Sequence, residues 1–328
     1  MVHKARNIWK EFEQTGALNA LIPVFAFLDE HTFLTKSGDL GIAFRVRGVD
    51  YECLDPSQVD HVARRFEVAL RSLTEDYRFY QYLLKRNCPS IPYRTYGSPV
   101  VDKAIKGRMA FLADRSDTLY SLDLYFVLLY EGLRTEKNWR QTLDAMRRNP
   151  VSTISERLSG GKAVALLDFE LMRAMQTLRA KANGFLIQIQ DFLRAEILEK
   201  HDTYRFLARL TNYAPYRSDS MQLKFDAFLD QQLAGSALEC QRDHLQLQDH
   251  AIRILSVTEP PAQTFANMLH ALMELPSNAI VVSEWKRADN FKIRKLIRSK
   301  RRHHHNSKTS LTNYLSDSQP SERSNADR

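Results

Sequence analysis

Alternating hydrophobic and polar positions dominate the first third of the chain, a pattern typical of short β-strands. Either such alternation or a dense run of aromatic and aliphatic residues predicts strands over residues 24–28, 32–36, 40–48, 77–85 and 119–130. The residues Ser37-Gly38-Asp39 supply a turn immediately before the third of these strands. Several strands therefore follow one another without an intervening helix.

Helical spacing of apolar residues is clearest after Asp55, where they recur from Val59 to Leu73. Asp55 suits the N-cap, Pro56 the first helical position, and Gln58 the partner position of a capping box. Further helices are predicted over residues 99–114, from Gly161 to about residue 200, and over 204–210 and 265–275. The segment His244–Val257 alternates as one strand, and Ala279–Trp285 as another.

The interleaving of helices with groups of adjacent strands favours an α+β fold, with mixed sheets and packed helices, over a purely parallel α/β sheet. The predicted organisation is an N-terminal arm, an α+β region, a basic connector and a disordered polar tail, at residues 1–15, 16–285, 286–310 and 311–328.

Composition places the chain among ordinary globular proteins, because its 328 residues are 44% hydrophobic and 26% charged. The three cysteines, Cys53, Cys88 and Cys240, lie far apart, which suits a reduced cytosolic compartment. No apolar stretch follows the charges of the N-terminus, so no signal peptide is predicted. The longest apolar runs fall short of the roughly 20 residues that a membrane-spanning helix needs.

The stretch Ser159-Gly160-Gly161-Lys162-Ala163 resembles the end of a phosphate-binding loop. Such a loop needs a glycine, four spacers and then Gly-Lys-Ser/Thr, so that backbone N–H groups face the phosphates and a hydroxyl reaches magnesium. Here Glu156 stands in place of the first glycine and Ala163 in place of the hydroxyl residue. We predict a glycine turn into a helix, whose buried face includes the apolar run ending at Asp168, and no nucleotide site.

Other polar groupings do not indicate chemistry. On one strand, His244 and His250 would share a face but stand about 20 Å apart, too far to hold one metal. His303-His304-His305 lies inside a basic run, where specific metal binding is not expected. The acidic residues Asp50, Glu52 and Asp55 suit turns and caps, and Asp123 interrupts an apolar strand on its opposite face. We assign no catalytic, cofactor-binding or metal-binding residue.

The positive charge is concentrated near the C-terminus. Between Lys286 and Lys308 there are ten Lys or Arg and one acid, Asp289, while the rest of the chain has a net charge of −1. Phe291, Leu296 and Ile297 are expected to form a narrow apolar edge in this segment. The segment suits a solvated connector, an anionic lipid surface or a nucleic-acid backbone. Its candidate contact residues are Lys286, Arg287, Lys292, Arg294, Lys295, Arg298, Lys300, Arg301, Arg302 and Lys308.

An ordered series of segments resembles the N-terminal region of the CagE/TrbE/VirB family of type IV secretion and conjugal-transfer ATPases, with the TrbE branch closest. The series begins with FLTKSGDLGIAFRVRGVDYECL at residues 33–54 and continues with RRFEVALRSLTEDYRFYQYLLKRN at 64–87 and LYSLDLYFVLLYEG at 119–132. HLQLQDHAIRILSVTEPP at 244–261, VVSEWKRADN at 281–290 and KRRHHHNSKTSL at 300–311 follow.

The resemblance implies a docking region of an ATPase that supports DNA or protein transfer across the cell envelope. In the family, a RecA-like motor domain follows this region, and we expect no RecA-like motor domain in this chain. ATP and magnesium are implied only for a longer relative that carries the motor, so hydrolysis by this chain is not expected. A truncated or split gene would explain these features. Implied partners are other secretion subunits, a separate ATPase domain and copies of itself, at the cytoplasmic face of the inner membrane. The alternative hypothesis is a nucleic-acid-binding module acting through residues 286–308.

Overall fold

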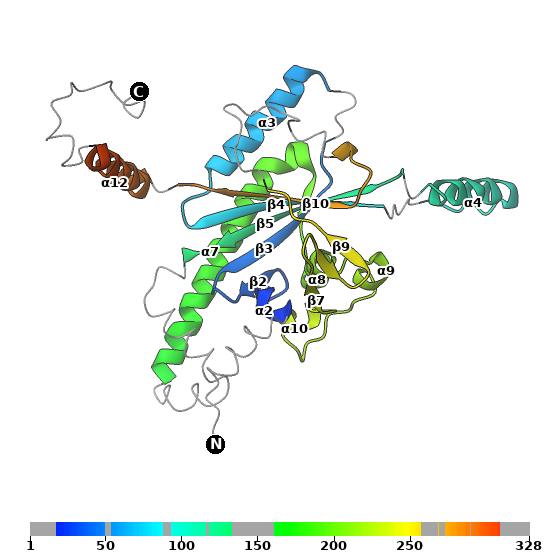
Figure 1. Ribbon diagram of the computed structural model, residues 1–328. Coiled ribbons are helices and arrows are strands. Elements are labelled where there is room, and N and C mark those ends of the chain that lie inside the picture. Colours follow the sequence, from blue (N-terminus) through cyan, green and yellow to red (C-terminus); the bar gives the residue numbers. More distant parts are fainter. Residues whose placement is uncertain are drawn as a thin grey trace. The chain divides into compact units, whose positions relative to one another are not determined.

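The computed structural model describes residues 18–49, 54–87, 93–115, 118–132, 161–256, 268, 273–288 and 290–308. Its larger sheet has seven strands (Figure 1), with the order β1-β2-β3-β5-β4-β10 and with β6 paired to β3. The strands are β1 Val24–Phe27, β2 Thr32–Thr35, β3 Leu40–Val46, β4 Tyr77–Arg86, β5 Ser121–Tyr130, β6 Ala195–Ile197 and β10 Ala279–Lys286.

Two long antiparallel ladders hold the middle of the sheet. Strand β3 pairs with β5 from Leu40↔Tyr130 to Val46↔Leu124, and β4 pairs with β5 from Tyr77↔Tyr130 to Arg86↔Ser121. Since successive side chains of a strand point to opposite faces, each strand contributes to two hydrophobic clusters. The sequence alternation predicted over residues 40–48 is confirmed as this two-faced strand.

The first cluster lies between one face of the sheet and two helices, α3 (Pro56–Arg71) and α7 (Gly161–Leu193). Phe44 and Phe126 from the sheet meet Phe66 of α3 and Phe185 of α7 there. The predicted start of α3 is confirmed, because the Asp55 backbone N–H donates to Gln58 Oε1 at 2.9 Å. This bond fixes the point at which the chain leaves the preceding loop.

The second cluster covers the opposite face of the sheet. Helices α8 (Lys200–Thr211), α10 (Leu229–Leu233) and α2 (Leu18–Leu21) supply its other side, and α9 (Pro215–Ser218) follows α8. Tyr125 of β5 stacks on Phe206 of α8 with ring centroids 4.4 Å apart. The sheet is therefore packed between helices on both faces, and the α+β prediction is confirmed.

A small second sheet corrects the predicted strand over residues 244–257. The chain instead forms three short antiparallel strands, β7 Leu238–Cys240, β8 Leu245–Leu247 and β9 His250–Ile252. Between β8 and β9 the chain reverses at Gln248, which has a φ of 54°. The alternating pattern continues across this turn, and no glycine marks it, so the sequence predicted one strand where the structure has a hairpin.

The long predicted helix ends earlier than expected. Helix α7 stops at Leu193, Arg194 has a φ of 43°, and the next residues form β6 against β3. Helix α4 (Pro99–Ala113) lies where it was predicted, while α8 begins four residues before its predicted start at Tyr204. Most of the predicted helix over residues 265–275 lies outside the described residues.

The chain divides into two compact units, residues 1–285 and 286–328. In the second unit the described element is one helix, α12 (Asn290–Lys308). Most of the predicted basic connector is therefore helical. Residues 1–15 and 311–328, predicted as an arm and a tail, lie outside the described residues.

Candidate functional site

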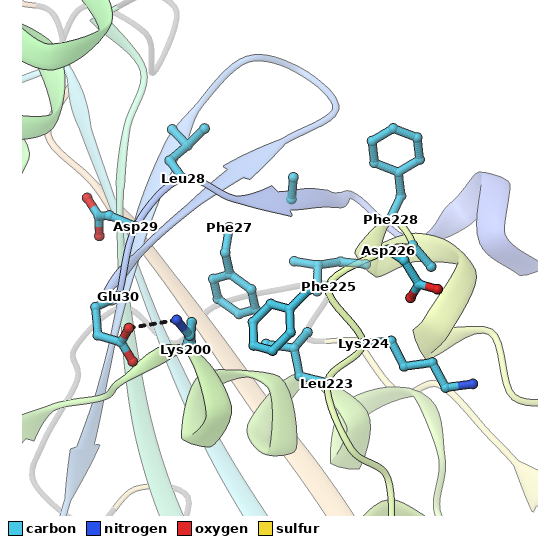
Figure 2. Close-up of a pocket in the computed structure, with 13 residues that line it drawn as sticks. Phe27, Leu28, Asp29, Glu30, Lys200, Leu223, Lys224, Phe225, Asp226 and Phe228 are labelled. Carbon is cyan, nitrogen blue, oxygen red and sulfur yellow. Dashed lines mark ion pairs between the residues drawn. The ribbon is translucent and has the colours of Figure 1, made fainter.

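An open hollow of about 550 Å³ lies beside β1 in the first unit (Figure 2). Its walls come from the end of β1, the turn after it, the first residue of α8 and the loop that leads into α10. The lining residues are Ala26, Phe27, Leu28, Asp29, Glu30, Lys200, Leu223, Lys224, Phe225, Asp226, Ala227, Phe228 and Leu229. Sequence reasoning missed this hollow, because its walls come from segments almost 200 residues apart.

The carboxylates of the turn after β1 are held in ion pairs. Lys200 Nζ lies 2.8 Å from Glu30 Oε2, and an Arg179 Nη atom lies 2.8 Å from Asp29 Oδ2. Burial alone would raise the pKa of Asp29, but the backbone N–H groups of His31 and Thr32 and the Arg179 guanidinium outweigh it and lower this pKa. Asp29 is therefore a fixed anion and is unsuited to act as a general acid.

Exposed aromatic rings line part of the hollow. Phe225 is 76% exposed, Lys200 Nζ lies 5.3 Å from its ring centroid, and the His201 ring meets it edge-on at 5.9 Å. Phe228 stacks on Phe25 of β1 at 4.5 Å. An exposed ring held by a cation can pack against an apolar or aromatic side chain of a partner. The arrangement suits binding more than catalysis.

The Gly-Lys pair considered as a phosphate loop lies at the start of a helix. Helix α7 begins at Gly161, so the prediction of a helix directly after the glycines is confirmed. Asp168 lies in the same helix and not at the end of a strand. The side chains of residues 161–168 lie outside the described ones, so the predicted buried face there stays a prediction.

Of the two candidate histidines, one lies in a strand of the second sheet and one in the turn before a strand. His250 is in β9 opposite Leu247, while His244 precedes β8 with its Nδ1 2.8 Å from Asp243 Oδ1. Within the described part of the chain, no group of three or more His, Cys, Asp or Glu is placed to hold a metal ion. Cys240 is a free, exposed thiol. Asp50, Glu52, Cys53, Cys88 and the side chains of His303–His305 lie outside the described residues.

Asp123 takes part in a structural charge network. Its Oδ2 lies 2.9 Å from Arg86 and 3.5 Å from Arg209, and Arg209 also contacts Asp219 at 2.9 Å. Arg209 donates to the Tyr125 hydroxyl at 3.0 Å, and burial raises the pKa of Tyr125. The network joins β4 and β5 to α8, which accounts for the acid that interrupts the apolar strand.

The predicted contact residues of the basic segment are brought together by the second unit. Lys286 ends β10, Arg287 follows it, and the remaining eight lie in α12. Every one whose side chain is described is exposed, namely Lys286, Arg287, Arg294, Lys295, Arg298, Lys300, Arg301 and Arg302. The side chains of Lys292 and Lys308 lie outside the described ones.

The apolar edge of α12 differs from the predicted one. Ile293, Leu296 and Ile297 are spaced i, i+3, i+4 and are 39%, 55% and 51% exposed. This spacing places the three residues on one side of the helix. Phe291, two residues before Ile293, does not share that side, because residues two apart in a helix do not face each other. Ile293 therefore belongs to the edge, a residue that the sequence prediction omitted. Phe291, which it included, has no described side chain.

Among the described residues, no helix combines the length and the apolar character needed to cross a bilayer. The exposed apolar residues of α12 are too few and too interspersed with cations for that role.

Comparison with known proteins gives one match to a family. Residues 31–138 match the N-terminal domain of the type IV secretion system ATPases VirB4/TrbE, a segment that runs from β2 through β5 and includes α3 and α4. No curated protein matches the chain. The match treats VirB4 and TrbE together, so closeness to the TrbE branch stays a prediction. Over residues 31–138, the predicted resemblance to the N-terminal domain of the VirB4/TrbE type IV secretion system ATPases is therefore confirmed.

Proposed function

We propose that this chain is a docking module of a type IV secretion ATPase, which binds other subunits of the secretion system during DNA or protein transfer. The observation that carries the proposal is α4, which lies inside the matched segment between the paired strands β4 and β5. No residue of α4 is buried, and Val100 and Phe111 are 79% and 55% exposed. Exposed aliphatic and aromatic side chains of this kind are typical of protein-binding surfaces.

The test is site-specific photo-crosslinking in cells that express the whole secretion system. A photoreactive phenylalanine at position 100 or 111 is expected to link this chain to another subunit. A photoreactive phenylalanine in place of Arg64, which is exposed on α3, is the matched control. Crosslinks that are absent at both α4 positions, or equal at Arg64, would contradict docking through α4.

We further propose that this chain supplies no nucleotide chemistry itself. Ala163 offers no hydroxyl to magnesium after Lys162, and Glu156 would add a negative charge beside the phosphates. ATP and magnesium would then be bound by a separate motor domain. Hydrolysis by the purified chain that persists after removal of contaminating ATPases would contradict this.

The location that suits this role is peripheral, at the cytoplasmic face of the inner membrane, in an assembly that contains further copies of the chain. Release from membranes by alkaline carbonate is the expected result, whereas retention in the pellet would contradict peripheral attachment. A nucleic-acid-binding module acting through residues 286–308 is the second candidate. It predicts DNA affinity that falls steeply with salt and disappears when the segment is deleted.

A further inference from the structure

We propose that α12 binds the surface of an anionic lipid bilayer, with Ile293, Leu296 and Ile297 lying at the boundary between headgroups and acyl chains. The proposal rests on the peripheral location proposed above and assigns to it a helix, an orientation and a lipid class. It does not require that any other secretion subunit be present.

The apolar stripe is the first observation. The three aliphatic residues lie on one side of α12 and keep between 39% and 55% of their surface exposed. A helix that places such a stripe next to a charged surface, with low overall hydrophobicity, lies in the plane of a membrane interface. From Asn290 to Arg302, α12 would extend about 20 Å along that plane.

The position of the cations is the second observation. Arg294 lies three residues before Ile297, and Arg301 lies four residues after it, so both border the stripe. Lys300 follows Leu296 by four residues and continues the stripe toward the C-terminus. Long basic side chains can place their stems along acyl chains while their charged groups reach lipid phosphates. Cations that border an apolar stripe therefore suit a bilayer surface.

The composition of the helix favours an anionic partner. Between Asn290 and Lys308 the sequence contains no Asp or Glu. Lys295, Arg298 and Arg302 lie away from the stripe and add to the attraction that an anionic leaflet exerts over about a Debye length. A zwitterionic surface would offer only the short apolar stripe a favourable environment.

Nucleic acid fits the same cations but not the apolar stripe. Contacts to a phosphate backbone need basic side chains alone and leave the three aliphatic residues in water. A bilayer satisfies both features of α12 at once. The structure therefore favours lipid over the nucleic-acid alternative, which becomes an outcome of the test.

The experiment measures sedimentation of the full chain with vesicles of phosphatidylcholine, alone or mixed with phosphatidylglycerol. We expect binding to the mixed vesicles only, and protection of the 290–302 amides from hydrogen exchange. Leu296→Ser with Ile297→Ser should weaken vesicle affinity about tenfold or more. Arg294→Gln with Arg298→Gln should weaken it by a similar factor and make it less sensitive to salt.

Matched controls use exposed residues elsewhere. Ile254→Ser with Leu255→Ser repeats the apolar change at an adjacent pair that is 79% and 87% exposed. Arg64→Gln with Arg71→Gln repeats the charge change on α3, where both residues are exposed. Neither control should alter vesicle binding, and circular dichroism verifies that each variant is folded.

A parallel measurement with DNA distinguishes a lipid partner from a nucleic-acid partner. Binding of a double-stranded oligonucleotide, measured by fluorescence anisotropy, should be insensitive to the apolar variant. If the apolar variant binds mixed vesicles as tightly as the unchanged chain, or if that chain does not bind them, the proposal is wrong. Because this test uses the chain alone, its failure leaves the crosslinking test of subunit docking unaffected.

Discussion

At Lys85 a cation lies in strand β4 with only 4% of its surface exposed. Its Nζ donates to the carbonyl oxygens of Met273 and Leu275, at 2.5 Å each, and lies 4.3 Å from the ring centroid of Tyr120. Two carbonyls and an aromatic face replace the water that a buried ammonium group loses. The residue thus joins β4 to the segment before β10 and has a structural role.

The buried Tyr77 and the partly buried Tyr82 limit the stability of the fold at alkaline pH. Burial, with smaller effects from Tyr130 and Asp76, raises the pKa of Tyr77 to about 12, and burial next to Tyr80 and Glu284 raises that of Tyr82 to about 12. In the unfolded chain these hydroxyls ionise near pH 10. The unfolded state therefore loses protons first, so the stabilisation is complete below pH 10 and is lost as the pH rises toward 12.

We predict that the free energy of unfolding falls between about pH 9 and about pH 11, by up to about 1.4 kcal/mol per pH unit for each of these two hydroxyls. Urea unfolding at both pH values measures this. Tyr82→Phe keeps the ring that contacts Phe206 but should reduce the fall, whereas Tyr93→Phe, at an exposed site, should not. If the free energy of unfolding of Tyr82→Phe falls as much as that of the unchanged chain, the Tyr82 hydroxyl does not contribute to the pH dependence.

At the scale of elements, α7 shows how one helix combines packing and exposed positions. Phe185 is fully buried, and its ring centroid lies 5.4 Å from Phe79 and 6.2 Å from Phe44. Two residues later, Ile187 is 69% exposed. Helical spacing explains the difference, since positions two apart face different sides.

Phe185→Ala should lower the free energy of unfolding by about 3–5 kcal/mol, because it removes a ring from a packed aromatic cluster and leaves a cavity. Ile187→Ala on the same helix should change it by less than about 0.5 kcal/mol. Chemical denaturation of both variants measures these values. Similar losses for the two would show that α7 does not pack on the sheet through the face that contains Phe185.

At the scale of the whole molecule, the net positive charge and the hydrophobic core belong to different parts of the sequence. Residues 286–328 contain twelve Lys or Arg and four Asp or Glu, which equals the net charge of +8 of the entire chain. All residues of both hydrophobic clusters lie before residue 286. The first unit thus contains both hydrophobic clusters and has no net charge. The second unit carries the net positive charge, and its described part contributes no residue to either cluster.

A chain that ends at Ala288 should therefore unfold with the same denaturant midpoint and slope as the full chain, because it keeps β10 and both clusters. It should also lose retention on a cation-exchange column. Equilibrium unfolding and chromatography of the two proteins provide the comparison. A loss of more than about 1 kcal/mol would mean that residues after 288 contribute to the core.

Much of the fold could be read from the sequence, and the two missed changes of chain direction have one physical cause. The strands of the central sheet and the cap of α3 follow local rules of alternation and capping. The missed reversal at Gln248 and the missed end of α7 at Arg194 are the two non-glycine positions of positive φ in the described chain. Glycine normally marks such positions, so these two gave no local signal.

The sequence by itself determined the alternating strands, the α+β class, the resemblance to the secretion ATPase family and the basic character of residues 286–308. These properties depend on residue types at short spacing, which a linear pattern contains. Only the tertiary structure decided that Ile293, Leu296 and Ile297 remain exposed on α12, that Phe225 and Lys200 meet at one hollow, and that α4 buries none of its side chains. Burial and long-range contact are properties of the folded chain, because packing among distant segments determines which side chains remain in water.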